Sequence, residues 1–139
     1  MELKDTQALY VLLKKHEDER KYPYVDTVGK ITIGIGRNLT DNGLSPEEIR
    51  FLFLNDVNAS WKECEAHIPG FADMTSNRKY AFVDIMFNIG WPRFSKFTDT
   101  LAATAAKDWD KVADELADSK WDKQVGSRAD ELQDMIRKG

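Results

Sequence analysis

The sequence predicts an α+β fold that is mainly helical, in which a long helix joins a small β-hairpin lobe to a helical C-terminal lobe. The spacing of apolar residues changes from a helical period to a period of two between residues 22 and 39, and then returns to a helical period. A strong helix-start signal at Ser45 and Pro46 follows the β-rich stretch. With 139 residues, of which 42% are hydrophobic, the chain is large enough to bury one continuous core.

An amphipathic helix is predicted over residues 5–17. Leu9, Leu12, Leu13 and His16 recur at the spacing of one helix face, and Glu17 ends that face. Apolar surroundings and the negative end of the helix dipole both favour the protonated form of a carboxyl group. Glu17 is therefore a candidate acid.

Residues 22–39 are predicted to form a hairpin or a three-stranded antiparallel sheet, with a turn at residues 26–29. Side chains alternate between the two faces of a strand. We therefore expect a core face built from Ile31, Ile33 and Ile35. The opposite face, with Thr32, Gly34 and Gly36, has little side-chain bulk and permits close approach of a ligand.

The remaining elements are predicted to be helices. Ser45 as N-cap, Pro46 at the first helical position and Glu48 as the capping-box partner begin a long helix that extends to about residue 66. Further helices are expected at residues 76–89, 94–104, 108–119 and 127–138. The expected organisation is one domain, with a β-containing lobe at 15–45, a connecting helix at 46–66, and a helical lobe made of 67–139 and the N-terminal helix. A cleft between the lobes is expected to hold the site.

Composition argues against several classes of partner and cofactor. The net charge of −4 does not favour nucleic acid as a ligand. The single cysteine, Cys64, cannot form an intrachain disulfide, and we interpret it as a core residue; two distant histidines do not indicate a metal site, and no cofactor is expected. Since no signal peptide or long apolar segment is recognised, we expect synthesis in a cytoplasm, no stable membrane association, and a monomer.

Glu17 and Asp26 are candidates for glycosidic-bond hydrolysis, which requires an acid to protonate the leaving oxygen and a second carboxylate to activate water. The environments expected for them differ, because Asp26 lies in a turn where it stays solvated and ionised. Thr32 is placed to hold the attacking water. By pattern alone, however, two of 24 acidic residues can equally be surface charges.

The motifs around these residues are specific. Glu17 closes the run at residues 13–17 (LKKHE), Asp26 follows within residues 24–29 (YVDTVG), and Thr32 begins residues 32–36 (TIGIG). In both spacing and residue type these segments closely resemble the active-site region of the phage lysozymes, glycoside hydrolase family 24. Similar segments follow at residues 52–57, 86–90, 97–101 and 121–129, so the resemblance spans nearly the whole chain.

The resemblance implies a muramidase that hydrolyses the β-1,4 bond between N-acetylmuramic acid and N-acetylglucosamine in peptidoglycan. It implies that Glu17 is the general acid, and that Asp26 and Thr32 position a water molecule that attacks with inversion. It further implies that Arg128 pairs with the catalytic glutamate across the cleft and that Arg37 forms a structural ion pair with Asp56. A phage lysis enzyme of this kind would reach the cell wall through a separate membrane pore.

The same resemblance implies four saccharide contacts, each with a structural alternative. They are Phe87, Asn88, Thr100 and Gln124. The alternative for Phe87 is packing, and for the three polar residues it is hydrogen bonding at helix ends.

One position departs from the family pattern, because Asp18 stands where the family usually has glycine, a residue suited to a helix C-cap with positive φ. Two other functions stay open. A lytic transglycosylase uses a single catalytic acid and needs no water-activating aspartate, and a lysozyme-fold module can bind glycan or a protein without cutting.

Overall fold

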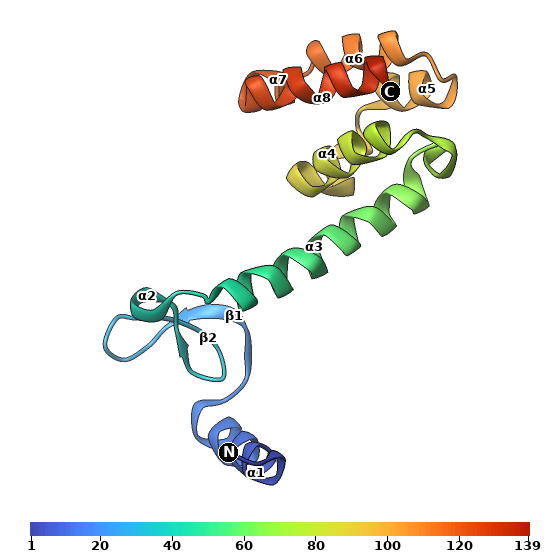
Figure 1. Ribbon diagram of the computed structural model, residues 1–139. Helices are drawn as coiled ribbons and strands as arrows, with labels where there is room; N and C mark the ends of the chain where they lie inside the picture. Colours follow the sequence, from blue (N-terminus) through green and yellow to red (C-terminus); the bar gives the residue numbers. More distant parts are fainter. The chain divides into compact units, whose positions relative to one another are not determined.

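The computed structural model describes residues 1–139, which form two compact units, Met1–Arg50 and Phe51–Gly139 (Figure 1). The chain is mainly helical and contains one three-stranded antiparallel sheet, which confirms the predicted fold class. None of its helices combines the length and the apolar character needed to cross a membrane. The proposed assignment of segments to lobes, including the N-terminal helix, stays a prediction.

The N-terminal unit contains the sheet. Its strands lie in the order β1-β2-β3, and Tyr24 of the first strand pairs with Thr32 of the second. The elements of this unit are α1 (Leu3–Glu17), β1 (Arg20–Val25), β2 (Ile31–Gly34), β3 (Arg37–Asn38), the short helix α2 (Leu39–Asn42), and the first turn of α3 (Pro46–His67). Of the two sheet arrangements left open by the sequence, the three-stranded one is present.

The burial of β2 differs from the prediction. Thr32 is only 4% exposed, whereas Ile31 is 48% exposed and Ile33 is half-buried. Ile35 lies beyond the strand, in the turn before β3. Side chains of neighbouring residues in a strand point to opposite faces, but this alternation does not determine which face is buried. The expected isoleucine core is therefore wrong for this strand.

The start of α3 confirms the predicted capping box. The Ser45 N–H donates to Glu48 Oε1 over 2.8 Å, and the Glu48 N–H donates to Ser45 Oγ over 3.2 Å. Pro46 is the first helical residue, where its missing N–H costs no hydrogen bond. The helix ends at His67, one residue beyond the predicted end.

The C-terminal unit is helical. After α3 it contains η1 (Phe71–Asp73), α4 (Ser76–Phe94), α5 (Thr98–Ala105), α6 (Trp109–Ala117), α7 (Lys120–Val125) and α8 (Ser127–Lys138). The bounds of α8 agree with the prediction, whereas α7 was missed. The α4 helix continues past the predicted end through a kink at Gly90, where φ is 74° and ψ is 163°.

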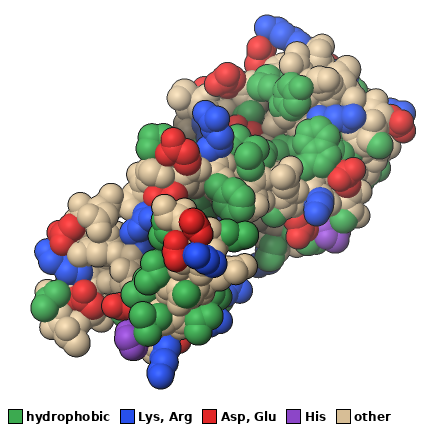
Figure 2. All heavy atoms as spheres, turned by 60° about the horizontal axis from the view of Figure 1, so that its bottom comes forward, with side chains coloured by type: hydrophobic (Ala, Val, Ile, Leu, Met, Phe, Trp, Pro, Cys, Tyr) green, Lys and Arg blue, Asp and Glu red, His purple; other side chains and the backbone are tan.

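Helices α4, α6 and α8 build the core of this unit, with α8 packed against both of the others. The largest fully buried side chains include Trp121, Phe82, Phe94, Ile85, Leu116 and Ile136. Cys64 is also fully buried, and burial raises the pKa of its thiol to about 12. The prediction that Cys64 is a core residue is confirmed. Figure 2 shows hydrophobic side chains (green) that also reach the surface among charged ones.

Candidate functional site

Asp26 is held by hydrogen bonds within the turn between β1 and β2. Its N–H donates to the Lys30 carbonyl over 2.9 Å. Its Oδ1 accepts hydrogen bonds from the N–H groups of Val28 at 3.0 Å and Lys30 at 2.8 Å. Aspartate favours such turns because its short side chain can bind backbone N–H groups a few residues ahead. Oδ2 accepts no hydrogen bond from the chain, so the turn orients the carboxylate and leaves one oxygen available to water.

Thr32 is linked to Asp26 through a shared acceptor. The Thr32 hydroxyl donates to the Lys30 carbonyl oxygen over 3.1 Å, and this is the oxygen that also receives the Asp26 N–H. Since the hydroxyl proton is used in this bond, the lone pairs of Oγ1 remain as acceptors. The structure thus brings together two of the three predicted catalytic residues at one backbone carbonyl.

Glu17 is the last residue of α1, and its carboxyl group lies against the turn between β2 and β3. A β-carbon placed on Gly36 would stand 2.9 Å from Glu17 Oε2 and 3.1 Å from Cδ. Glycine leaves this space to the carboxyl group, so the close approach at position 36 is made by Glu17 itself. No residue of α1 is buried. Glu17 itself is exposed, so the apolar surroundings expected for its carboxyl group are not present in the N-terminal unit.

Asp18, which stands where the family usually has glycine, adopts the positive φ to which glycine is suited. Asp18 is the C-cap of α1, with φ 68° and ψ 169°, and its N–H donates to the Lys14 carbonyl. Its Oδ1 accepts from the Glu19 N–H over 2.9 Å. A positive φ with an extended ψ is a region populated almost only by glycine, so an aspartate there is strained.

In the C-terminal unit, Arg128 pairs with a carboxylate that the sequence did not single out. Asp84 Oδ1 accepts from Arg128 Nε at 2.7 Å and lies 2.6 Å from Nη2. Asp84 is on α4 and Arg128 is on α8, 44 residues apart, and no local pattern signals a pair so distant in the chain. The predicted pairing of Arg128 with the catalytic glutamate stays a prediction.

Phe87 is 45% exposed and lines a pocket of about 500 Å³ on the C-terminal unit. Asp84 and Arg128 line the same pocket. Its other walls are apolar or aromatic side chains, namely Phe53, Val57, Trp61, Tyr80 and Val83. An exposed aromatic ring beside charged groups is available to a ligand, so the saccharide-contact prediction for Phe87 remains open.

The three polar residues predicted as saccharide contacts make contacts within the protein. Asn88 Oδ1 accepts from the indole N–H of Trp121 over 2.8 Å, and Gln124 Oε1 accepts from Arg93 Nη2 over 3.3 Å. Thr100 is buried. Asn88 and Gln124 thus have hydrogen-bond partners within the protein, and the saccharide contacts of all three residues stay predictions.

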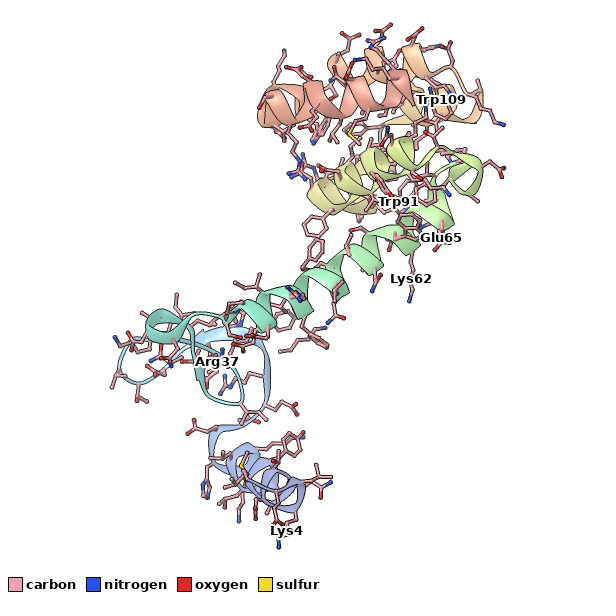
Figure 3. The ribbon with its side chains drawn as sticks, in the orientation of Figure 1. Lys4, Arg37, Lys62, Glu65, Trp91 and Trp109 are labelled. Atoms are coloured by element: carbon pink, nitrogen blue, oxygen red, sulfur yellow. The ribbon has the colours of Figure 1, made fainter.

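Arg37 forms the expected kind of ion pair, but with a different partner. Its Nη1 donates to Glu48 Oε1 over 2.8 Å and lies 2.6 Å from Oε2, at the first turn of α3 (Figure 3). The predicted partner, Asp56, was wrong, because the capping-box glutamate already presents its carboxylate there. The hydrogen bond from Arg37, followed by that from the Ser45 N–H, lowers the pKa of Glu48 to about 2.

The similarity of the chain to known proteins shows its family. Residues 14–138 match the phage lysozyme family, from the last turn of α1 to the end of α8. The chain belongs to the phage lysozyme family. Membership implies a glycoside hydrolase that acts on peptidoglycan. All the predicted site residues of this lysozyme-family chain, from Glu17 to Arg128, fall inside the matched segment.

Its curated relatives include proteins from a eukaryote and from a phage. The chain is 27% identical over 161 aligned positions to probable T4-type lysozyme 2 of Dictyostelium discoideum, with 95% of both chains covered. It is 26% identical to probable T4-type lysozyme 1 of the same organism, with 92% of both chains covered. It is also 27% identical to the pre-baseplate central spike protein Gp5 of Enterobacteria phage T4, covering 92% of this chain but 27% of that protein.

Proposed function

We propose that this phage-lysozyme-family chain is an endo-acting muramidase that hydrolyses the β-1,4 bond between N-acetylmuramic acid and N-acetylglucosamine. The observation that carries the proposal is the joint attachment of Asp26 and Thr32 to the Lys30 carbonyl. This arrangement leaves a carboxylate oxygen and a hydroxyl lone pair, which are the acceptors needed to hold a water molecule. A transglycosylase has no need of such a water site.

In the proposed reaction, Glu17 gives its proton to the glycosidic oxygen as the bond to the anomeric carbon breaks. Water held by Asp26 and Thr32 attacks that carbon from the opposite face, and Asp26 takes the proton that the water loses. The sugar leaves with inverted configuration at the anomeric carbon. Arg128 is the proposed support for the catalytic carboxyl group, and Phe87 is a proposed saccharide contact that is 45% exposed.

Product analysis of digested sacculi tests the reaction. Hydrolysis gives new reducing ends, each carrying one oxygen from water, whereas a lytic transglycosylase gives anhydro ends and a binding module gives no cut. We expect an ¹⁸O label from the solvent in the new ends by mass spectrometry. Anhydro ends, or an absence of new ends, would refute the proposal. The anomer formed first, read by NMR, tests inversion.

Two substitutions separate the proposed roles. Glu17→Gln should abolish cutting, and Asp26→Asn should lower kcat by about 100-fold or more, because general acid and general base catalysis are each worth about that much. Glu19→Gln removes a neighbouring exposed carboxylate and should leave kcat unchanged. Anhydro-forming activity that survives Asp26→Asn would favour the transglycosylase alternative.

We also propose that the chain acts as a phage endolysin, reaching the wall through a separate membrane pore. Bacteria that express the chain alone should then stay intact and should lyse when a pore former opens the inner membrane. The Glu17→Gln variant, expressed at the same level, should not lyse them. Equal lysis without a pore former would contradict the proposed release through a membrane pore, but it would not contradict the proposed hydrolysis.

A further inference from the structure

The carbonyl oxygen that Asp26 and Thr32 share is that of Lys30. It belongs to the peptide group between Lys30 and Ile31, and the N–H of the same peptide group donates to Thr40 Oγ1 over 2.8 Å. A trans peptide group is planar, and its C=O and N–H point in opposite directions. The orientation of the carbonyl is therefore set from both ends, by Asp26 and Thr32 at one end and by Thr40 at the other.

Thr40 supplies this acceptor at the point where the sheet ends. The pairing of β2 with β3 stops at Thr32 and Asn38, because the chain turns into α2 at Leu39. Ile31 lies one residue beyond that last pair. The short helix α2 contacts β2 (Figure 1), and a side-chain oxygen of α2 takes the place that the carbonyl of a longer β3 would have.

Stability gives little reason for a hydroxyl group at position 40. Thr40 is exposed and Ile31 is 48% exposed, so solvent water can accept from the Ile31 N–H if the hydroxyl is removed. A solvent molecule that exchanges freely does not hold the peptide group in one orientation. The bond to Thr40 therefore contributes more to the direction of the Lys30 carbonyl than to the free energy of folding.

We propose that Thr40 is a positioning residue for the hydrolysis, because its Oγ1 keeps the Lys30 carbonyl directed at Asp26 and Thr32. The inference rests on the proposed function, in which these two residues hold the attacking water. Thr40 itself touches neither the water nor the sugar. It acts by keeping the two acceptors of the water in place, and a displacement of about 1 Å in such a site can cost about 100-fold in rate.

A matched control exists on the next residue of α2. Asp41 Oδ1 lies 3.1 Å from Lys30 Nζ, so Asp41 holds the side chain of Lys30, whereas Thr40 holds its peptide group. Both side chains of this ion pair are exposed. Asp41→Asn removes the charge that ties α2 to Lys30 without removing the acceptor of the Ile31 N–H.

The experiment measures kcat and KM on purified peptidoglycan for Thr40→Val, Thr40→Ser and Asp41→Asn. Valine has the shape of threonine without the hydroxyl group, so we expect Thr40→Val to lower kcat about tenfold and to leave KM nearly unchanged. Serine keeps the acceptor oxygen, and Thr40→Ser should retain most of the parental kcat. Asp41→Asn should keep the parental kcat.

Amide hydrogen exchange, followed by NMR, tests the bond itself. The Ile31 amide proton should exchange faster in Thr40→Val than in the parent, and at close to the parental rate in Thr40→Ser. The amide protons of α8, which belongs to the other unit, should exchange equally in all variants. Faster exchange in both units would instead indicate a general loss of folding, and the fall in kcat would then not support positioning.

The outcomes that overturn the inference are distinct from those that overturn the proposed function. An active parent whose kcat is unchanged by Thr40→Val overturns the role of Thr40 and leaves the proposed function intact. The same holds if Thr40→Ser or Asp41→Asn lowers kcat as much as Thr40→Val does. A parent that makes no new reducing ends overturns the proposed function and this inference with it.

Discussion

The carboxyl group of Glu17 occupies the space that a side chain at position 36 would need, since a β-carbon on Gly36 would stand 2.9 Å from Oε2. The contact joins the end of α1 to the turn between β2 and β3, both inside the N-terminal unit. Gly36 has φ 70°, which also favours glycine. Glycine at position 36 therefore permits both the backbone conformation of the turn and the position of the Glu17 carboxyl group.

Gly36→Ala should therefore reduce activity more than stability. The strained φ costs about 1 kcal/mol of unfolding free energy. The contact itself costs little stability, because the flexible end of Glu17 can rotate away from the new methyl group. That rotation displaces the acid, and we expect kcat to fall at least tenfold by the proximity argument. Denaturant unfolding and kcat on peptidoglycan measure the two effects.

Gly43→Ala is the matched control for Gly36→Ala. Gly43 has φ 57°, and nothing lies within 4 Å of its β-carbon position. It should show a similar loss of stability with unchanged kcat. Equal kcat losses in the two variants would mean that backbone strain, and not the displaced Glu17, explains the effect.

Asp18→Gly should stabilise the protein. At φ 68° and ψ 169°, a residue other than glycine costs about 1–3 kcal/mol. The substitution also loses the exposed bond from the Glu19 N–H, worth about 0.5–1.5 kcal/mol. We expect a net gain of about 1 kcal/mol in unfolding free energy, measured in urea. Asp18→Ala keeps the strain and loses the bond, so it should be less stable than the parent; a gain of equal size in both variants would exclude the backbone explanation.

Structural features that depend on a few neighbouring residues could be predicted from the sequence. Ser45, Pro46 and Glu48 lie within four consecutive residues, and the capping box they predict is present. The hairpin turn at Asp26 is equally local. The short helix α7 was missed because its six residues are fewer than two helical turns and show no periodicity.

The ion-pair partners of two arginines could not be predicted from the spacing of residues in the sequence. The carboxylates that hold Arg37 and Arg128 are Glu48 and Asp84, and each pair is formed by the fold and not by spacing. The alternation in β2 identified two faces but assigned burial to the isoleucines, whereas Thr32 is the buried residue. Of the site, the sequence and the family resemblance predicted the proposed catalytic set, but not the Lys30 carbonyl that Asp26 and Thr32 share.

The Glu48–Arg37 pair should make stability depend on pH in a defined range. The folded-state pKa of Glu48 is lowered from 4.5 to about 2, chiefly by the hydrogen bond from Arg37. The folded state therefore binds a proton at Glu48 more weakly than the unfolded state does. The stabilisation is fully present above pH 4.5 and is lost as the pH falls toward 2.

Glu48→Gln should remove this part of the pH dependence. The variant should be less stable than the parent at pH 6, and the two curves of unfolding free energy should converge as the pH approaches 2. Glu47→Gln, one residue earlier in the same turn, has no arginine partner and should leave the curve unchanged. Parallel curves for Glu48→Gln and the parent would show that the pair does not set this pH dependence.

Asn88→Ala should lower stability because it leaves the indole N–H of Trp121 without its acceptor. Trp121 is 1% exposed, and its Nε1 donates to Asn88 Oδ1 over 2.8 Å. A buried donor left unpaired costs about 1–3 kcal/mol. Asn88→Asp keeps an acceptor oxygen and should stay closer to the parent. Unfolding in urea, with KM on peptidoglycan measured in parallel, separates this structural role from a saccharide contact.

The Trp121→Phe background completes the test of Asn88. Phenylalanine has no N–H, so Asn88→Ala should cost clearly less in that background than in the parent, and the difference is the coupling energy of the pair. The same cost in both backgrounds would mean that the 2.8 Å bond does not stabilise the fold. A raised KM with unchanged unfolding free energy would instead support a contact between Asn88 and the saccharide. The hydrogen bond to Trp121 favours the first result, because an amide oxygen already bound to an indole has less capacity left for a sugar hydroxyl.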